Sequence, residues 1–120
     1  MKKFYFLSTC TTCQRISGHL ELSAEFELQD IKKTPISSKQ LEQLKELSGS
    51  YETLFSKRAK LYKDLGLKEK SLEEHDFKNY ILEDYTFLKR PVLVLNDQLF
   101  IGNSSKVINS AKTALLNEKK

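Results

Sequence analysis

The two cysteines of this 120-residue chain lie in one short stretch, Cys10-Thr11-Thr12-Cys13. A cysteine at the start of a helix meets N–H groups that have no partner inside the helix, and the positive end of the helix dipole favours its thiolate form. Residues at positions i and i+3 share a helix face, so Cys13 could attack a mixed disulfide formed on Cys10. The pattern therefore indicates thiol or disulfide chemistry, with Cys10 as the more exposed nucleophile.

Two other interpretations of the cysteine pair are weaker. A zinc site would need two further ligands, and the only other candidates are His19 and His75, which lack the paired spacing of a zinc finger. We therefore expect no metal site. The cysteines could also be inert buried thiols, but the hydroxyl-bearing Thr11 and Thr12 between them argue against a purely apolar position.

The elements around the cysteines follow from hydrophobic spacing. The run Phe4-Tyr5-Phe6-Leu7 is too short for a helix and is rich in aromatic residues, which predicts a buried strand. Cys13, Ile16 and Leu20 then recur at helical spacing. Residues 24–30 alternate between apolar and polar, which is typical of a strand with one buried face. A strand, a helix and a second strand predict a β-α-β unit with a parallel strand pair.

A helical insertion is expected at about residues 37–84. A capping-box pattern at Ser37 and Gln40 opens a helix that stops at residues 48–50, and apolar spacing predicts a second helix over residues 51–65. A further capping-box pattern at Ser71 opens a third helix, over about residues 71–81. Arg58 falls within the apolar stripe of the second helix, where a cation is costly unless it meets an anion or a carboxylate. The alternative is that its aliphatic stem lies along the edge of the core while its charged end stays in water.

The last part of the chain predicts a hairpin and a helix. Residues 92–95 and 98–101 flank an Asn-Asp turn, and Pro91 fits only at the start of its strand. A final helix follows, with Val107 to Leu115 contributing its buried face. The order β-α-β, helical insertion, β-β-α predicts an α/β, thioredoxin-like fold: a four-stranded mixed sheet with helices on its faces, in a single domain of residues 1–120.

Composition limits the classes of function. The net charge is +4, and the basic pairs, among them Lys119-Lys120, are scattered along the chain, so charge does not favour direct nucleic-acid binding. The apolar run after Met1 is too short for a signal peptide or a membrane span. Two cysteines suit a working dithiol in a reducing compartment better than a disulfide scaffold. We therefore expect a cytoplasmic protein without membrane attachment.

Taken together, the motifs of the chain resemble those of the arsenate reductase (ArsC)/Spx family over essentially the whole length. The ordered combination is more specific than Cys-x-x-Cys alone. The motifs are Cys10-Thr-Thr-Cys13, Ser56-Lys57-Arg58, Tyr62-Lys-Asp-Leu65-Gly66-Leu67, Leu88-Lys89-Arg90-Pro91 and Ile101-Gly102-Asn103.

The resemblance implies roles for particular residues. It implies that Cys10 is the nucleophile and that Arg90 precedes a cis proline facing the Cys10 loop, while Arg58 matches the helix arginine of Spx-like members. Arsenate reductases place their helix arginine where this chain has Ser56 and carry a further arginine where it has Asn103, which argues against arsenate as the substrate. The predicted catalytic residues are Cys10, Cys13, Arg58 and Arg90, and the predicted substrate-binding residues are Thr11, Thr12, Pro91 and Asn103.

The predicted function is that of a thiol–disulfide oxidoreductase related to the arsenate reductases, with Cys13 resolving the adduct on Cys10. We expect no bound cofactor, and glutathione with glutaredoxin, or thioredoxin, as the electron donor. The alternative is a Spx-like redox-sensing regulator that binds RNA polymerase. In that case, the Cys10–Cys13 disulfide would change the affinity for the polymerase.

Overall fold

The structure is a computed structural model in which residues 1–118 are described; the predicted basic pair Lys119-Lys120 lies outside the described residues. The chain divides into two compact units. Unit 1 comprises residues 1–34 and the chain from Arg90 onward, and unit 2 comprises Pro35–Lys89. The expectation of a single domain with an insertion at about residues 37–84 stays a prediction.

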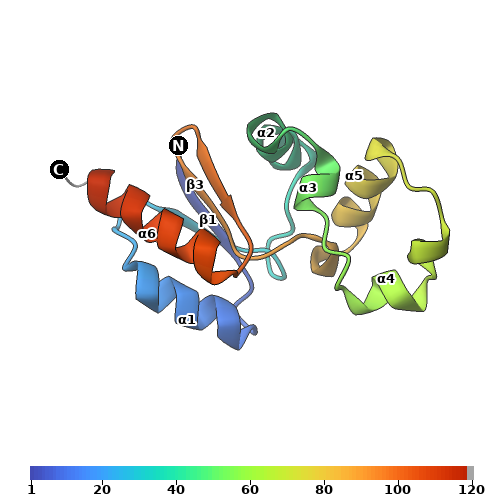
Figure 1. Ribbon diagram of the computed structural model, residues 1–120, viewed down its shortest axis with the longest axis horizontal. Coiled ribbons are helices and arrows are strands. Elements are labelled where there is room, and N and C mark those ends of the chain that lie inside the picture. The colour runs from blue at the N-terminus through green and yellow to red at the C-terminus, as the bar shows by residue number, and fades with distance from the viewer. Residues whose placement is uncertain (119–120) are drawn as a thin grey trace. The chain divides into compact units, whose positions relative to one another are not determined.

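Unit 1 contains a four-stranded mixed sheet (Figure 1). Its strands are β1 (Lys2–Phe6), β2 (Glu27–Asp30), β3 (Val92–Leu95) and β4 (Gln98–Ile101), in the spatial order β2-β1-β3-β4. β1 runs parallel to β2 and antiparallel to β3, and β3 runs antiparallel to β4. The predicted sheet, with a parallel β-α-β unit and a hairpin, is confirmed.

Two helices pack on one face of this sheet: α1 (Thr11–Leu20) and α6 (Ser105–Glu118) (Figure 1). The predicted helical spacing of Ile16 and Leu20 places both side chains on one face of α1, where they share a core with residues of β1 and β3. Burying such apolar side chains contributes about 1.5–3 kcal/mol each. The core consists of Phe4, Ile16, Leu20, Phe26, Leu93, Leu95, Ala111 and Leu115.

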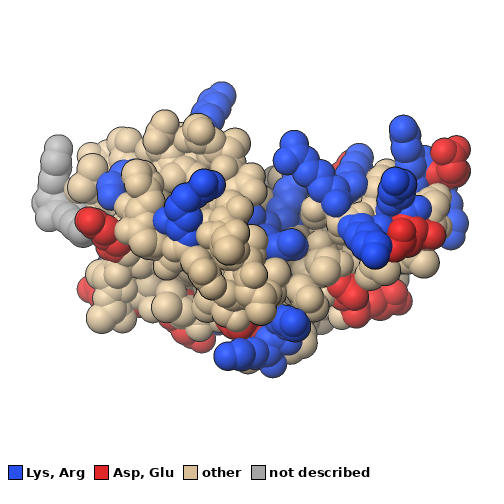
Figure 2. All heavy atoms as spheres, turned by 90° about the horizontal axis from the view of Figure 1, so that it is seen from below, with Lys and Arg blue, Asp and Glu red and all other residues tan. Residues whose placement is uncertain are grey.

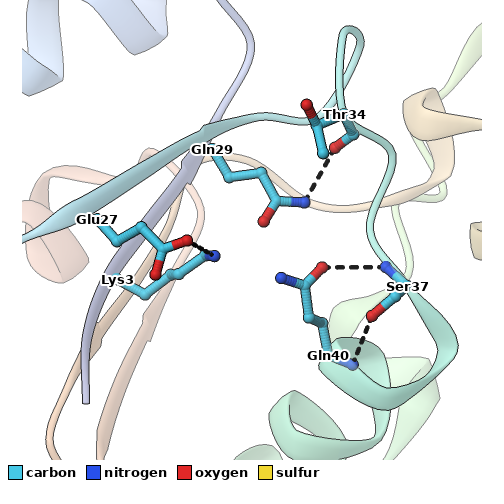
Figure 3. A network of polar contacts seen from close by, with 6 residues as sticks. All are labelled: Lys3, Glu27, Gln29, Thr34, Ser37 and Gln40. Carbon is cyan, nitrogen blue, oxygen red and sulfur yellow. Dashed lines mark hydrogen bonds and ion pairs between the residues drawn. The ribbon is translucent and has the colours of Figure 1, made fainter.

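The predicted buried face of the second strand is confirmed at Phe26, which joins the core, but is wrong at Leu28. β2 begins only at Glu27, its Leu28 is 57% exposed, and Gln29 is 7% exposed. As Figure 3 shows, the Gln29 amide donates a 2.9 Å hydrogen bond to the Thr34 carbonyl, while Glu27 pairs with Lys3 at 2.8 Å. Hydrogen bonding makes the burial of Gln29 tolerable, so at this sheet edge polar contacts override the apolar alternation.

The hairpin is formed as predicted. Asn96 in its turn has φ 58°, a left-handed conformation that asparagine tolerates better than most residues. The Arg90–Pro91 peptide bond is cis, which confirms the prediction from the family resemblance. After β4, Gly102 has φ 94° and donates a 2.9 Å hydrogen bond to the Pro91 carbonyl. The start of the loop to α6 is thereby attached to the start of β3.

Unit 2 begins with helix α2 (Ser38–Ser48), which starts as the sequence predicts. The Ser37 hydroxyl accepts a hydrogen bond from the Gln40 N–H, and the Gln40 side chain accepts one from the Ser37 N–H (Figure 3). This capping box satisfies two N–H groups that the helix cannot. The helix ends at Gly49, whose φ of 95° is readily adopted only without a side chain.

The predicted helix over residues 51–65 is wrong. The chain forms two short helices instead, α3 (Tyr51–Leu54) and α4 (Lys60–Asp64). Between them Phe55 is extended and forms an antiparallel bridge with Leu88. The Phe55 ring also packs among four aromatic rings, which makes the bridge more favourable than another helical turn. These are Tyr62, Phe77, Tyr80 and Phe87.

The third predicted helix is present but starts later. α5 (Glu74–Glu83) is capped by a box of Glu73 and Asp76 rather than by Ser71. The Glu74 carboxylate instead accepts hydrogen bonds from the first N–H groups of α3, at 2.8 and 3.1 Å, and thus caps another helix. Two 3₁₀ turns, η1 (Leu67–Glu69) and η2 (Tyr85–Phe87), complete the unit.

Charged side chains of both signs are spread over the face shown in Figure 2. Within residues 1–118, no helix combines the length and the apolar character that a membrane span requires.

Candidate active site

The cysteine pair lies where β1 leads into α1. Cys10 is the N-cap of α1 and has an extended backbone (φ −94°, ψ 114°), so its thiol is at the positive end of the helix. Cys10 is partly exposed, whereas Cys13, in the first turn, is fully buried. Both are free thiols. The placement of Cys10 just before the first helical residue is the one that the sequence predicts.

The loop that carries Cys10 is fixed by three hydrogen bonds. The Cys10 N–H donates to the Leu7 carbonyl at 3.0 Å. The Gln14 side-chain amide donates to the Ser8 carbonyl, and the Ser8 hydroxyl donates to the Asp30 carboxylate at the end of β2. The loop before Cys10 is therefore hydrogen-bonded both to α1, through Gln14, and to β2, through Asp30.

The environment of Cys10 lowers its pKa below the ordinary value. Partial burial alone would raise the pKa, but hydrogen bonds to the sulfur outweigh it. The donors are the backbone N–H and thiol of Cys13, the backbone N–H of Thr12 and the guanidinium of Arg90. All of these groups favour a negative charge on the sulfur, so the geometry favours the reactive thiolate.

The environment of Cys13 acts in the opposite direction. Burial raises the pKa of its thiol to about 11, and the negative charge that develops on Cys10 adds to this shift. A hydrogen bond with the Leu7 backbone and the charge of Arg90 lower the pKa, but by less. Cys13 therefore stays a protonated hydrogen-bond donor while Cys10 carries the charge.

The reason for placing Arg58 in the site is not supported by the structure. Because the helix over residues 51–65 breaks at Phe55, the apolar stripe that would have directed Arg58 inward does not exist. Arg58 is exposed in the turn before α4, within unit 2. Its role in catalysis stays a prediction that rests on the family resemblance.

The four predicted substrate-binding residues belong to unit 1. Thr11 and Thr12 form the first turn of α1, and the Thr12 N–H contacts the Cys10 sulfur. Pro91 is buried next to Arg90, and Asn103 is exposed in the loop after Gly102. Their roles as substrate ligands stay predictions.

Sequence reasoning missed the residues that hold the Cys10 loop, namely Ser8, Gln14 and Asp30. A usable signal was present for Asp30. The carboxyl ends of two parallel neighbouring strands meet at the same edge of a sheet, so the residue that ends β2 had to lie near the loop that follows β1.

No group of three or more His, Cys, Asp or Glu side chains in the described part of the chain could hold a metal ion. His75 is exposed and lies 3.3 Å from the carboxylate of Asp76, as expected for a surface residue.

Comparisons with known proteins agree with this architecture. The model of the ArsC family matches residues 5–111. The global transcriptional regulator Spx of Lactiplantibacillus plantarum is 24% identical over 100 residues, which cover 82% of this chain and 76% of that protein.

Solved structures are similar over most of the chain. A Streptococcus mutans protein described as a possible arsenate reductase is 29% identical, with a TM-score of 0.68, over 88% of this chain and 92% of its own. An arsenate reductase from Vibrio cholerae is 19% identical, with a TM-score of 0.76, over 92% of this chain and 96% of its own. The predicted thioredoxin-like fold is thereby confirmed, and the family match shows that the chain belongs to the ArsC family.

Proposed function

We propose that this protein is a thiol–disulfide oxidoreductase in which Cys10 is the nucleophile and Cys13 the resolving cysteine. The observation that carries the proposal is the opposite tuning of two thiols that are hydrogen-bonded to each other. Four donors, among them Arg90, favour the thiolate of Cys10, while burial keeps Cys13 protonated. An enzyme that attacks with one cysteine and resolves with the other needs this asymmetry.

In the first step, the Cys10 thiolate attacks one sulfur of a substrate disulfide. A Cys10–substrate bond forms, the substrate S–S bond breaks, and the departing sulfur leaves as a thiolate that takes up a proton from solvent. The positive end of α1 and the Arg90 guanidinium stabilise the charge on the Cys10 sulfur before the attack.

In the second step, Cys13 loses its proton to solvent and its thiolate attacks the Cys10 sulfur. The Cys10–Cys13 disulfide forms and the second substrate thiol departs. The substrate has then gained two electrons and the protein has lost two. Once Cys10 is in a disulfide, its negative charge no longer raises the pKa of Cys13, so the resolving thiol ionises more easily.

An external dithiol or two thiol molecules must reduce the Cys10–Cys13 disulfide for turnover. We propose glutathione with glutaredoxin, or thioredoxin, as the donor, and the reducing cytoplasm as the compartment. No bound cofactor takes part in this scheme.

The test is a single-turnover reaction of the reduced protein with 2-hydroxyethyl disulfide, quenched with acid and analysed by mass spectrometry. The wild-type protein should yield the intramolecular disulfide, the Cys13→Ser variant should accumulate a mixed disulfide on Cys10, and the Cys10→Ser variant should form neither at an appreciable rate. Adduct formation on Cys13 in the Cys10→Ser variant, at the wild-type rate, would refute the assignment.

Arsenate is a less favoured substrate. The family resemblance implies a cation at the position of Asn103, which is an exposed, uncharged residue here. NADPH consumption with arsenate, measured once with glutathione and glutaredoxin and once with thioredoxin, tests this directly. Turnover that is lost in the Cys10→Ser variant would establish arsenate reduction.

A second candidate function is that of a Spx-like regulator that binds RNA polymerase. It is supported by the similarity to the Lactiplantibacillus plantarum regulator over most of both chains. The reduced and oxidised forms of the protein would then differ in affinity for immobilised RNA polymerase, measured by surface plasmon resonance. No binding of either form would leave the oxidoreductase as the better function.

A further inference from the structure

A groove of mixed polar and apolar lining lies between α1, the helix that Cys10 caps, and α6 in unit 1. It has a volume of about 310 Å³ and is formed by α1, by α6 and by the loop that leads into α6. Its lining residues are Arg15, Ile16, His19, Asn103, Ser105, Ile108 and Asn109. The volume is at the lower end of the range for small-molecule sites.

Contacts within unit 1 connect this groove to the reactive sulfur. Arg90 donates a hydrogen bond to Cys10, and Pro91, which follows Arg90, accepts one from Gly102. Asn103, the next residue, lines the groove. On the other wall, Arg15 lies five residues after Cys10, a rise of about 7.5 Å along α1. Both walls of the groove are thus connected to the reactive sulfur, one through Arg90 and the loop after β4 and the other through α1 itself.

The lining selects for an anionic ligand. No carboxylate of the described chain lies within ion-pair distance of Arg15, and neither Asp nor Glu lines the groove. A guanidinium binds a carboxylate through two parallel hydrogen bonds, and the side chains of Asn103, Ser105 and Asn109 can add further hydrogen bonds.

A second groove in unit 1 provides an internal contrast. It is larger, about 730 Å³, and lies between the β3–β4 hairpin and α6. Asp97 and Glu118 line it, and Lys and Arg do not. Glu118 pairs with Lys2 at 3.3 Å, but Asp97 leaves the larger groove without a cation to bind an anion, so charge distinguishes the groove between α1 and α6 from it.

We propose that the groove between α1 and α6 binds the carboxylate of a small disulfide substrate while Cys10 attacks its sulfur, with Arg15 as the principal binding residue. The proposal rests on the proposed function and adds the class of substrate: a carboxylate-bearing, low-molecular-weight disulfide. The Cys10 thiolate displaces one carboxylate-bearing thiolate, and the other half stays bonded to Cys10 with its carboxylate at Arg15.

Three disulfides of similar length and different charge test the proposal: 3,3′-dithiodipropionate (anionic), 2-hydroxyethyl disulfide (neutral) and cystamine (cationic). The rate of adduct formation on Cys10 is measured in the Cys13→Ser background by quenched-flow mass spectrometry. We expect the anionic disulfide to react fastest with Cys10, the neutral one more slowly and the cationic one slowest. Arg15 is exposed, so the Arg15→Gln change should lower the ratio of the anionic to the neutral rate by about two- to fivefold, the range for one exposed ion pair.

Lys106→Gln is the matched control, because Lys106 is an exposed cation of α6 that does not line the groove. This variant removes the same charge and should keep the wild-type ratio. An equal fall in both variants would mean that the general field of the protein, not the groove, selects the substrate. An unchanged ratio in Arg15→Gln would also overturn the proposal. Failure of all three disulfides to react would instead refute the proposed oxidoreductase function.

A binding measurement gives a readout that does not depend on activity. Glutathione disulfide is added to the ¹⁵N-labelled Cys10→Ser variant, and amide shifts are followed by NMR. We expect the amide shifts of Arg15, Asn103 and Asn109 to change and to saturate with ligand concentration. The Cys10→Ser/Arg15→Gln double variant should not show these changes. Shifts confined to the hairpin groove around Asp97 would contradict the assignment.

Discussion

The two ends of the Cys-x-x-Cys motif lie in opposite environments, although only two residues separate them. Cys10 is the half-buried N-cap of α1, where hydrogen-bond donors converge on its sulfur. Cys13 is fully buried one turn later, where the loss of water raises its pKa. The difference teaches that one helix start can produce both an ionised and a neutral thiol, because the donors gather at the cap while the following turn faces the core.

The largest expected effect is a difference in alkylation between the two cysteines. A thiol with a pKa of about 11 is ionised to only about one part in a thousand at pH 8, and Cys13 is also shielded from the reagent. Iodoacetamide at pH 8 should therefore modify Cys10 at least about a hundredfold faster than Cys13. Peptide mapping by mass spectrometry measures both rates, and the urea-unfolded chain is the control in which they converge.

The alkylation rates of the two cysteines should depend on pH in different ways. Because the pKa of Cys10 is lowered from 9.0, its alkylation rate should rise with pH and reach half of its plateau below pH 9, whereas the rate for Cys13 should still be far from its plateau there. Equal rates for the two cysteines in the folded protein would break the comparison.

The second effect concerns the charged donor at Cys10. Replacing Arg90 with Gln removes a charged hydrogen bond to the Cys10 sulfur and should raise the pKa of that thiol. A hydrogen bond to a charged group contributes about 1.5 kcal/mol, so the reaction of Cys10 at pH 7 should slow about tenfold. Thiolate absorbance near 240 nm against pH measures the shift.

Arg90→Lys is the matched variant for this experiment. It keeps the positive charge but loses the planar geometry of the guanidinium, so its effect should be smaller than that of Arg90→Gln. Equal effects of the two variants would show that geometry, and not charge, sets the pKa of Cys10. Thermal unfolding curves verify that both variants fold.

A smaller effect is expected from the loop that carries Cys10. The Ser8 hydroxyl lowers the pKa of the Asp30 carboxyl by hydrogen bonding, so Ser8→Ala should raise that pKa. A carboxyl with a lowered folded-state pKa adds stability above its unfolded value, and this stability is lost as the pH falls through the folded value. The urea midpoints of the wild type and Ser8→Ala should therefore differ at pH 7 and converge at the acidic end.

The same change should slow the reaction of Cys10 about threefold, because a loosened loop places the sulfur less well. Asp30→Ala should have a similar effect, and the Ser8→Ala/Asp30→Ala double variant should be no slower than either alone. Additive losses would mean that the two residues act independently and that their hydrogen bond does not position the thiol. The ¹³C chemical shift of the Asp30 side-chain carboxyl, followed against pH, measures the pKa change that Ser8→Ala is expected to cause.

The features that sequence reasoning predicted correctly depend on local signals. The cap position of Cys10 follows from an aromatic strand that ends just before a helical pattern, and the capping box at Ser37 involves residues three positions apart. The hairpin follows from the turn around Asn96. The cis peptide before Pro91 was not derivable from pattern and came from the family resemblance.

The features that it missed depend on contacts between distant segments. The apolar spacing from Tyr51 onward fits one long helix, yet Phe55 leaves it to form a bridge with Leu88 and to join an aromatic cluster. The exposure of Leu28 follows from the place of β2 at the sheet edge. Helical and strand periodicity reflects only residues that are near one another in the sequence. It therefore cannot reveal contacts with segments that are distant in the chain, such as the bridge from Phe55 to Leu88.

The smallest effect is expected at Arg58. The resemblance predicts a role for it at Cys10, but the helix that would have directed it inward is broken at Phe55, and Arg58 is exposed in the turn that follows. The field of an exposed charge is screened by water and salt. Arg58→Gln should therefore change the pKa of Cys10 less than Arg90→Gln does, and the reaction rate by less than about twofold.

Thiolate absorbance of both variants in the same buffer makes this comparison direct, and Lys57→Gln controls for the loss of an adjacent cation. An effect of Arg58→Gln as large as that of Arg90→Gln would show that the turn before α4 brings Arg58 to the thiolate during the reaction. The asymmetry between Cys10 and Cys13 would then depend on both units of the chain. With the expected outcome, unit 1 alone accounts for it, because its described donors to the Cys10 sulfur are Thr12, Cys13 and Arg90.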